Sequence, residues 1–187
     1  MKIIFRRLAL VLLATGLWTG CQSPQATPVP RNPAATRNNC YSLLHQLLDE
    51  QKDVSLLRFI KREHPDVKTL VKKIATVSGT GARLLEKLAH QDPSIRLDDF
   101  RLPAGESATR DAIAATKQKE LLSQTGDEFE LTLLLTQTEA LSYAWHLAKV
   151  AGENEPQPER ARALAGVGAD MKNLYEEVFA LLLAKMK

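Results

Sequence analysis

The sequence has little of what a β-sheet protein needs. β-Branched residues are sparse, and no alternating apolar run is bounded by turn residues. The sequence also has no Gly-x-Ser-x-Gly elbow, and no Gly-Lys-Ser/Thr follows the glycines of "SGTGAR". The first absence favours an all-α chain. The other two argue against a serine hydrolase and a phosphate-binding loop, so we do not expect an enzyme.

Basic charge is not in excess once the N-terminal residues are set apart. The whole chain carries 25 Lys and Arg against 22 Asp and Glu. Lys2, Arg6 and Arg7 lie within residues 1–20, which contain no acid, so the remainder holds 22 of each sign. Proteins that bind nucleic acid usually present a basic face. We therefore expect no nucleic-acid partner.

The first 20 residues have the pattern of a secretory signal peptide. A basic start is followed by an apolar run from Leu8 to Leu17 and then by the small residues Thr19 and Gly20. The run has about ten residues, whereas a membrane-spanning helix needs roughly 20. We therefore expect residues 1–20 to be a signal peptide rather than a permanent anchor.

The residues around Cys21 resemble the lipobox of bacterial lipoproteins, which reads Leu, a small residue, Gly or Ala, and then Cys. Thr19, Gly20 and Cys21 fit, whereas Leu17 stands one place too early and Trp18 occupies the usual Leu position. The resemblance implies cleavage before Cys21, a diacylglycerol on its thiol and acylation of the new amine. Two or three acyl chains anchor firmly, because each buried methylene contributes about 0.8 kcal/mol.

The residue after the cysteine bears on location. By the same resemblance, Gln22 in place of Asp implies the outer membrane, with the protein facing the periplasm. The alternative is an ordinary signal peptide with an incidental cysteine, which would leave Cys21 and Cys40 able to form a disulfide. If Cys21 is lipidated, Cys40 is the one remaining thiol, and we expect it to be buried beside Leu43 and Leu44.

Residues 21–39 are predicted to be a lipid-anchored, Pro-rich linker. Four prolines occur among Gln, Ser, Thr, Ala and Asn, without apolar periodicity. Such a segment cannot bury enough surface to offset its ordering entropy, so we expect a disordered tether.

Residues 40–187 suit one domain with four amphipathic helices. They are predicted over about 39–62, from Pro65 to about 90, 107–150 and 158–186, with a break near Gly126 left open. Apolar seams recur at four-three spacing; in the last helix the seam comprises Leu164, Val167, Met171, Leu174, Val178 and Leu181. Such helices predict a four-helix bundle, which we expect to run up-down-up-down. Spacing alone does not decide whether the connection "HQDPSIRLDDFRLPAGES" crosses the bundle.

Candidate metal ligands are few. A ferritin-like centre would use Glu-x-x-His, which the sequence lacks. His45 and Asp49 are four residues apart, as are Glu86 and His90, so each pair can share a helix face. Glu86 and His90 lie off the apolar seam, which indicates solvent. No seam position of the last three helices holds Asp, Glu or His, so no metal or cofactor is expected.

The order of these pieces nevertheless resembles a family of exported bacterial ferritin-like proteins of unknown function. The resemblance covers about residues 54–185 and is carried by "DDFRLPAGE", "GDEFELTLLL" and the end of "ARLLEKLAH", through Leu85, Leu88 and Ala89. It implies a ferritin-like bundle. Where the family has Asp-His, this chain has Gly79-Thr80, and the family's later histidines have no clear counterpart. A metal role is therefore not carried over.

Three functions are consistent with the sequence. The first is a lipid-anchored cell-envelope protein whose bundle is a non-enzymatic interaction or structural module, bound to the membrane through its anchor, with an envelope protein as candidate partner. The second is a ferritin-like metal-binding or redox-related periplasmic protein, by fold analogy. The third is a small-molecule binder that uses the bundle interior.

Overall fold

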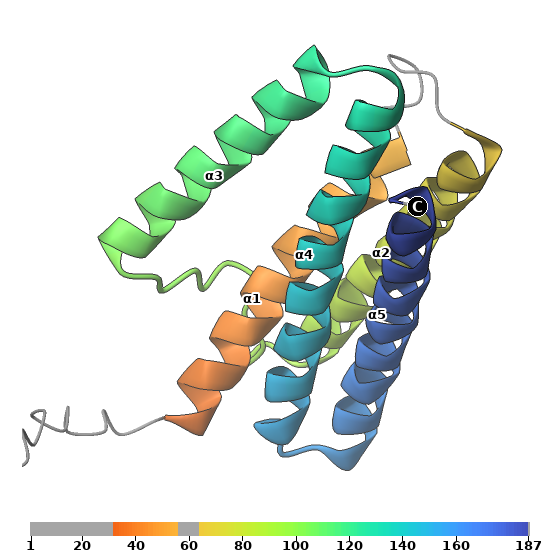
Figure 1. Cartoon of the computed structure of the whole chain (residues 1–187). Helices are drawn as coiled ribbons and strands as arrows, with labels where there is room; N and C mark the ends of the chain where they lie inside the picture. The colour runs from red at the N-terminus through yellow and green to blue at the C-terminus, as the bar shows by residue number, and fades with distance from the viewer. Residues whose placement is uncertain (1–31, 56–63, 187) are drawn as a thin grey trace, which may run out of the picture. The chain divides into compact units, whose positions relative to one another are not determined.

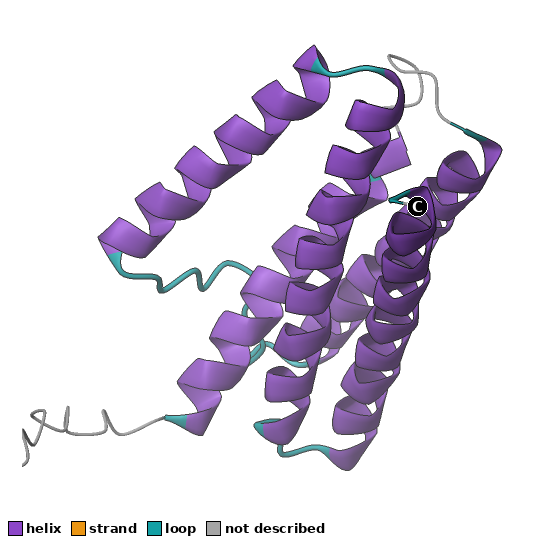
Figure 2. Cartoon of the chain, viewed as in Figure 1, coloured by secondary structure: helices purple, strands orange, loops and turns teal. Residues whose placement is uncertain are grey.

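The computed structural model describes residues 32–55 and 64–186. All regular structure in these ranges is helical, as the sequence predicts (Figures 1 and 2). The helices are α1 (Pro33–Lys52), α2 (Pro65–Gln91), α3 (Ala104–Ser123), α4 (Gly126–Glu153) and α5 (Pro158–Lys185). The predicted signal peptide, most of the linker, and Leu57 and Ile60 of the predicted first helix lie outside the described residues.

Helix α1 begins earlier than the sequence analysis predicts. The Asn32 side chain accepts hydrogen bonds from the backbone N–H groups of Ala34 and Ala35 at 3.0 and 3.3 Å, and Pro33 occupies the first turn. Asparagine caps and first-turn prolines are favourable at a helix start. Residues 33–39 are therefore helical, and their assignment to a disordered linker is wrong. The α-helix ends at Lys52, where a helix to about residue 62 was predicted.

The third predicted helix is two helices. α3 ends at Ser123, and α4 begins at Gly126, whose φ of +59° lies in the left-handed region that glycine adopts without a Cβ clash. The break left open near Gly126 is therefore present. It separates two helices that differ strongly in burial, since α3 has no buried side chain and α4 has many.

Four helices, α1, α2, α4 and α5, share one apolar core, which we call the four-helix core (Figure 1). The predicted α5 seam is confirmed, with Leu181 half-buried and the other members buried. The largest fully buried side chains are Tyr41, Leu44, Leu48, Ile74, Leu85, Phe129, Leu133, Leu134, Leu141, Leu164, Met171 and Leu174. α3 lies outside this core and contacts α4.

The helix directions differ from the predicted up-down-up-down order. Tyr41 in α1 bonds Glu155, which follows α4, so α1 and α4 are antiparallel. His64, before α2, bonds Glu130 near the start of α4, so α2 and α4 begin at the same end and run parallel. The predicted order is therefore wrong. The physical reason is α3, whose 20 residues extend about 30 Å and return the chain to the end where α2 began.

Candidate functional site

The predicted lipidation site and the second cysteine have different outcomes. Cys21 lies outside the described residues, so its lipidation stays a prediction. Cys40 lies in α1 with a free thiol and is buried, which confirms the predicted burial. Burial raises the pKa of the Cys40 thiol, because the thiolate would lose solvation. Cys40 therefore packs as a core residue, and its raised pKa disfavours the thiolate that reactive cysteines use.

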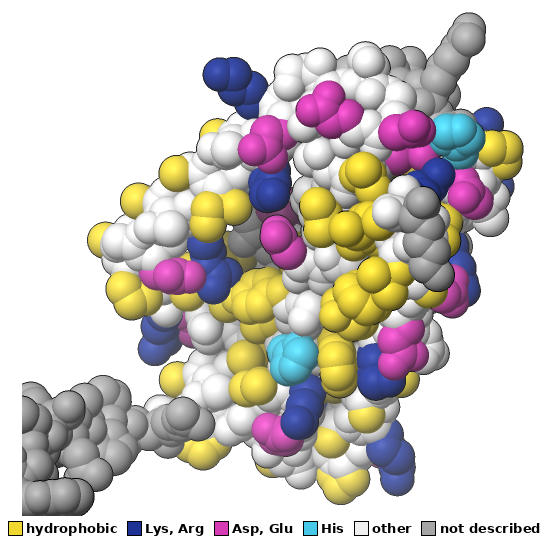
Figure 3. Space-filling view, in the orientation of Figure 1, with side chains coloured by type: hydrophobic (Ala, Val, Ile, Leu, Met, Phe, Trp, Pro, Cys, Tyr) yellow, Lys and Arg dark blue, Asp and Glu magenta, His cyan; other side chains and the backbone are white. Residues whose placement is uncertain are grey.

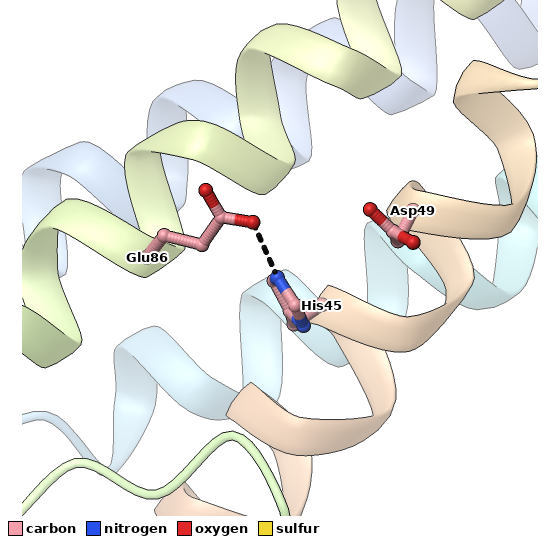
Figure 4. A group of neighbouring side chains, drawn as sticks. All are labelled: His45, Asp49 and Glu86. Atoms are coloured by element: carbon pink, nitrogen blue, oxygen red, sulfur yellow. Dashed lines mark hydrogen bonds and ion pairs between the residues drawn. The ribbon is translucent and has the colours of Figure 1, made fainter.

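The structure joins two pairs that the sequence analysis treated separately. His45 and Asp49 of α1 face Glu86 of α2, and His45 Nε2 lies 3.0 Å from Glu86 Oε1 (Figure 4). One ligand atom from each of the three residues lies within 4.8 Å of the others. Glu86 and His90 are not buried, in line with the prediction, but His90 is not part of this group. We call His45, Asp49 and Glu86 the α1–α2 triad.

A tight helix–helix contact supports the α1–α2 triad. Leu44 and Leu85, the neighbours of His45 and Glu86 in sequence, are fully buried. One turn away, a Cβ added at Gly81 would lie 2.9 Å from Leu48 Cδ1, so α1 and α2 approach closely there. The two backbones that carry the triad are therefore fixed by packing rather than by the polar side chains themselves.

Lys52 also contacts the α1–α2 triad. Its ammonium forms an ion pair with Asp49 through Oδ1. This hydrogen bond lowers the pKa of Asp49 and keeps the carboxylate charged. Asp49 therefore already has one basic neighbour, Lys52.

A buried carboxylate, Glu130, lies at the end of the four-helix core where α2 and α4 begin. It accepts hydrogen bonds from the His64 backbone N–H and from Lys185 Nζ, the latter at 2.8 Å, and its Oε2 lies 2.9 Å from His64 Nδ1. Burial raises the pKa of Glu130, but these bonds outweigh burial and the pKa is lowered. A second metal-compatible group, with His64 and Asp127, therefore already contains its own cation.

Glu130 was not recognised from the sequence, because the four-three spacing of α4 can be followed along two neighbouring stripes. One stripe begins at Phe129 and passes through Thr136 and Tyr143, which are only half-buried. A second stripe, one residue on, is more completely buried and comprises Glu130, Leu134, Gln137, Leu141, Ala144 and Ala148. This stripe has the same four-three spacing. In the sequence it looks less like a core-facing stripe because it includes the polar residues Glu130 and Gln137.

The opposite end of the four-helix core contains the other buried acid, Glu155. It accepts hydrogen bonds from Tyr41 Oη at 3.1 Å and from Arg160 Nη2 at 2.7 Å, and Arg160 also pairs with Asp92 at 2.9 Å. Burial raises the pKa of Glu155, but the bonds from Arg160 and the Gln157 N–H outweigh burial and lower it. Burial, together with the charge of Glu155, raises the pKa of Tyr41. This network ties α1, α2 and α5 together.

A cleft of about 530 Å³ lies between α1, α3 and α4. Its apolar walls include Leu43, Leu47 and Phe100, and its polar wall includes Glu50, Arg110 and Asp111. The Arg110 guanidinium lies 4.9 Å from the Tyr143 ring centre and donates a hydrogen bond to Tyr143 Oη at 2.7 Å. The cleft is outside the four-helix core, because it separates that core from α3.

The outer face of α4 and α5 has several exposed apolar side chains. Leu135, Phe179 and Leu183 are 48%, 44% and 47% exposed, and the Tyr175 and Phe179 rings are stacked with centres 6.0 Å apart. Figure 3 shows hydrophobic side chains gathered over these two helices. We call Leu135, Tyr175, Phe179 and Leu183 the α4–α5 face. Tyr175, Phe179 and Leu183 are four residues apart, so they form one stripe.

Comparison with protein-family models, with curated proteins and with solved structures found no match to this chain. Within residues 32–55 and 64–186, no helix combines the length and the apolar character needed to cross a membrane.

Proposed function

We propose that this protein is a lipid-anchored cell-envelope protein whose helical domain is a non-enzymatic interaction module. Residues 17–21 support the anchor through their resemblance to a lipobox. The observation that carries the module is the α4–α5 face. Contiguous exposed apolar surface marks interaction sites, since covering one large apolar side chain contributes about 1.5–3 kcal/mol. The partner is an envelope protein that presents an apolar surface of its own.

The experiment for this proposal is site-specific photo-crosslinking in cells. A photoreactive phenylalanine analogue at position 179 is expected to give one discrete crosslinked product. The same analogue at position 87, an exposed position of α2, is the matched control and is expected to give none. No product at position 179, or equal products at both positions, would contradict a partner on the α4–α5 face.

For the finer fold, we infer a ferritin-like four-helix bundle with α3 as its crossover. Ferritin-like folds use one long crossover connection, which makes the second and third bundle helices parallel. The parallel direction of α2 and α4 supports this arrangement. A ferritin-type metal centre inside the bundle is not favoured, because the two buried acids among the described residues, Glu130 and Glu155, are bonded to Lys185 and Arg160.

A small-molecule binder is the second candidate function, favoured by the cleft beneath α3 rather than by a cavity in the bundle interior. The cleft combines apolar walls with the charged side chains of Glu50, Arg110 and Asp111, and Arg110 already pairs with Glu106, so the cleft fits a small amphiphile with a neutral polar or zwitterionic group. Native mass spectrometry of the protein purified from cells tests this candidate. A co-purifying mass that Arg110→Ala removes would support it, and the same spectrum for both proteins would contradict it.

A further inference from the structure

We propose that the α1–α2 triad of His45, Asp49 and Glu86 binds one divalent transition-metal ion of the zinc type. The site is independent of the lipid anchor and of the α4–α5 face. It departs from the sequence-based expectation of no metal, because that expectation considered each helix alone. Only the packing of α1 against α2 places Glu86 next to His45 (Figure 4).

The spacing of the donor atoms fits a single ion. Zinc lies about 2.0–2.2 Å from imidazole nitrogen and carboxylate oxygen, so two of its ligands in tetrahedral geometry are roughly 3.3 Å apart. His45 Nε2 and Glu86 Oε1 are 3.0 Å apart, and one ligand atom from each of the three residues, Asp49 included, lies within 4.8 Å of the others. A small rotation of the side chains therefore brings all three donors around one ion. In binding, the ion takes the place of the hydrogen shared by His45 and Glu86, which leaves to solvent as a proton.

The described residues contain two metal-compatible groups, which differ in how their carboxylates pair with lysine side chains. In the group around Glu130, the Lys185 ammonium and the His64 backbone N–H already occupy both carboxylate oxygens. In the α1–α2 triad, Lys52 contacts Asp49 through Oδ1, which leaves Oδ2 able to bind the ion. The triad can therefore accept an ion without losing a buried ion pair, whereas the other group cannot.

The ligand set selects the class of metal. One imidazole and two carboxylates suit zinc, cobalt or nickel better than calcium or magnesium, which prefer oxygen ligands alone. Three protein ligands leave a fourth position for water or an external ligand. The exposed fractions of the His45, Asp49 and Glu86 side chains, 21%, 44% and 53%, leave a direct path for an ion from solvent.

The experiment is calorimetric titration of Zn²⁺ into the tag-free, chelator-treated full chain, with Co²⁺ absorbance as a second readout. We expect one ion per chain. His45→Ala and Asp49→Asn are expected to weaken binding at least about 10–100-fold, because loss of a ligand costs no less than loss of a supporting partner. Asp49→Asn keeps the His45–Glu86 contact, so its effect does not depend on that contact between α1 and α2.

Two controls separate this site from its competitors. His90→Ala removes a histidine close to Glu86 in sequence, and Asp127→Asn removes a ligand of the other group; both are expected to bind zinc as the wild type does. Undiminished binding by His45→Ala would overturn the proposal, as would loss of binding in Asp127→Asn or failure of the wild type to bind. None of these results depends on the fate of Cys21.

Discussion

Two buried carboxylates secure opposite ends of the four-helix core. Glu130 and Glu155 are each surrounded by basic and N–H donors, and their pKa values are lowered although burial alone would raise them. A buried charge is costly without partners, so removing one partner of a buried ion pair is strongly destabilising. These residues therefore contribute to stability rather than to chemistry, and that contribution depends on pH in a defined direction.

Glu155→Gln is expected to destabilise the fold by about 2–3 kcal/mol at pH 7, since it removes charged hydrogen bonds from Arg160 while Asp92 remains. A group with a lowered folded-state pKa contributes fully above its unfolded value, about 4.3 for glutamate, and loses that contribution as pH falls through the folded value. The difference in the free energy of unfolding between wild type and variant, measured by urea unfolding, should therefore become smaller below about pH 4.

The matched control is Glu153→Gln. The Glu153 side chain is exposed, and its ion pair with Lys149 spans 3.9 Å, so removing it should cost less than about 0.5 kcal/mol at any pH. A Glu155 variant as stable as this control at pH 7 would contradict the structural role of the network.

Two glycines provide a second comparison at the residue scale. Gly166 lies inside α5, and a Cβ added there would have nothing within 4 Å, so Gly166→Ala should stabilise the protein by about 0.5–1 kcal/mol through helix propensity. At Gly81 the same change places a methyl group 2.9 Å from buried Leu48, and crowding of a packed core costs about 1–3 kcal/mol. Thermal unfolding of both variants tests the contrast; equal shifts would refute the close α1–α2 approach.

Among the helices, α3 differs from the rest. It has 20 residues and no buried side chain, whereas most of the stability of a helix in a protein comes from the packing of a buried face. Amide hydrogen exchange should therefore be much faster in α3 than in α4, whose inner face is buried. Protection in α3 equal to that in α4 would mean that α3 packs against another surface in solution.

The helices were predictable where one apolar face meets the core. The α5 seam follows a regular spacing, so the sequence predicts it closely. The start of α1 depends on the Asn32 cap. The hydrogen bonds of that cap leave no periodic apolar pattern in the sequence. The direction of α4 depends on whether α3 folds back or crosses, which spacing does not encode. Local pattern therefore predicted the elements but not their order in space.

Across the whole molecule, the candidate sites arise from contacts between distant residues. His45 and Glu86 are 41 positions apart, and His64 and Glu130 are 66 apart. Each residue alone looks like a solvated side chain, and only helix packing brings the pairs together, so the metal-compatible groups could not be predicted from the sequence. The lipid anchor differs from these sites, because it is predicted from a short motif of consecutive residues and does not depend on how the chain folds. Its prediction therefore depends on the sequence alone and stays a prediction.

The most direct test of the lipid anchor is the mass of the protein purified from cell membranes. It is measured by mass spectrometry under denaturing conditions, beside that of the Cys21→Ala variant. The account predicts a chain that begins at Cys21 and carries the added mass of a diacylglycerol and an acyl group, with no lipid on Cys21→Ala. An unmodified N-terminus in the wild type would contradict the lipid-anchored envelope protein and would leave Cys21 able to pair with another thiol.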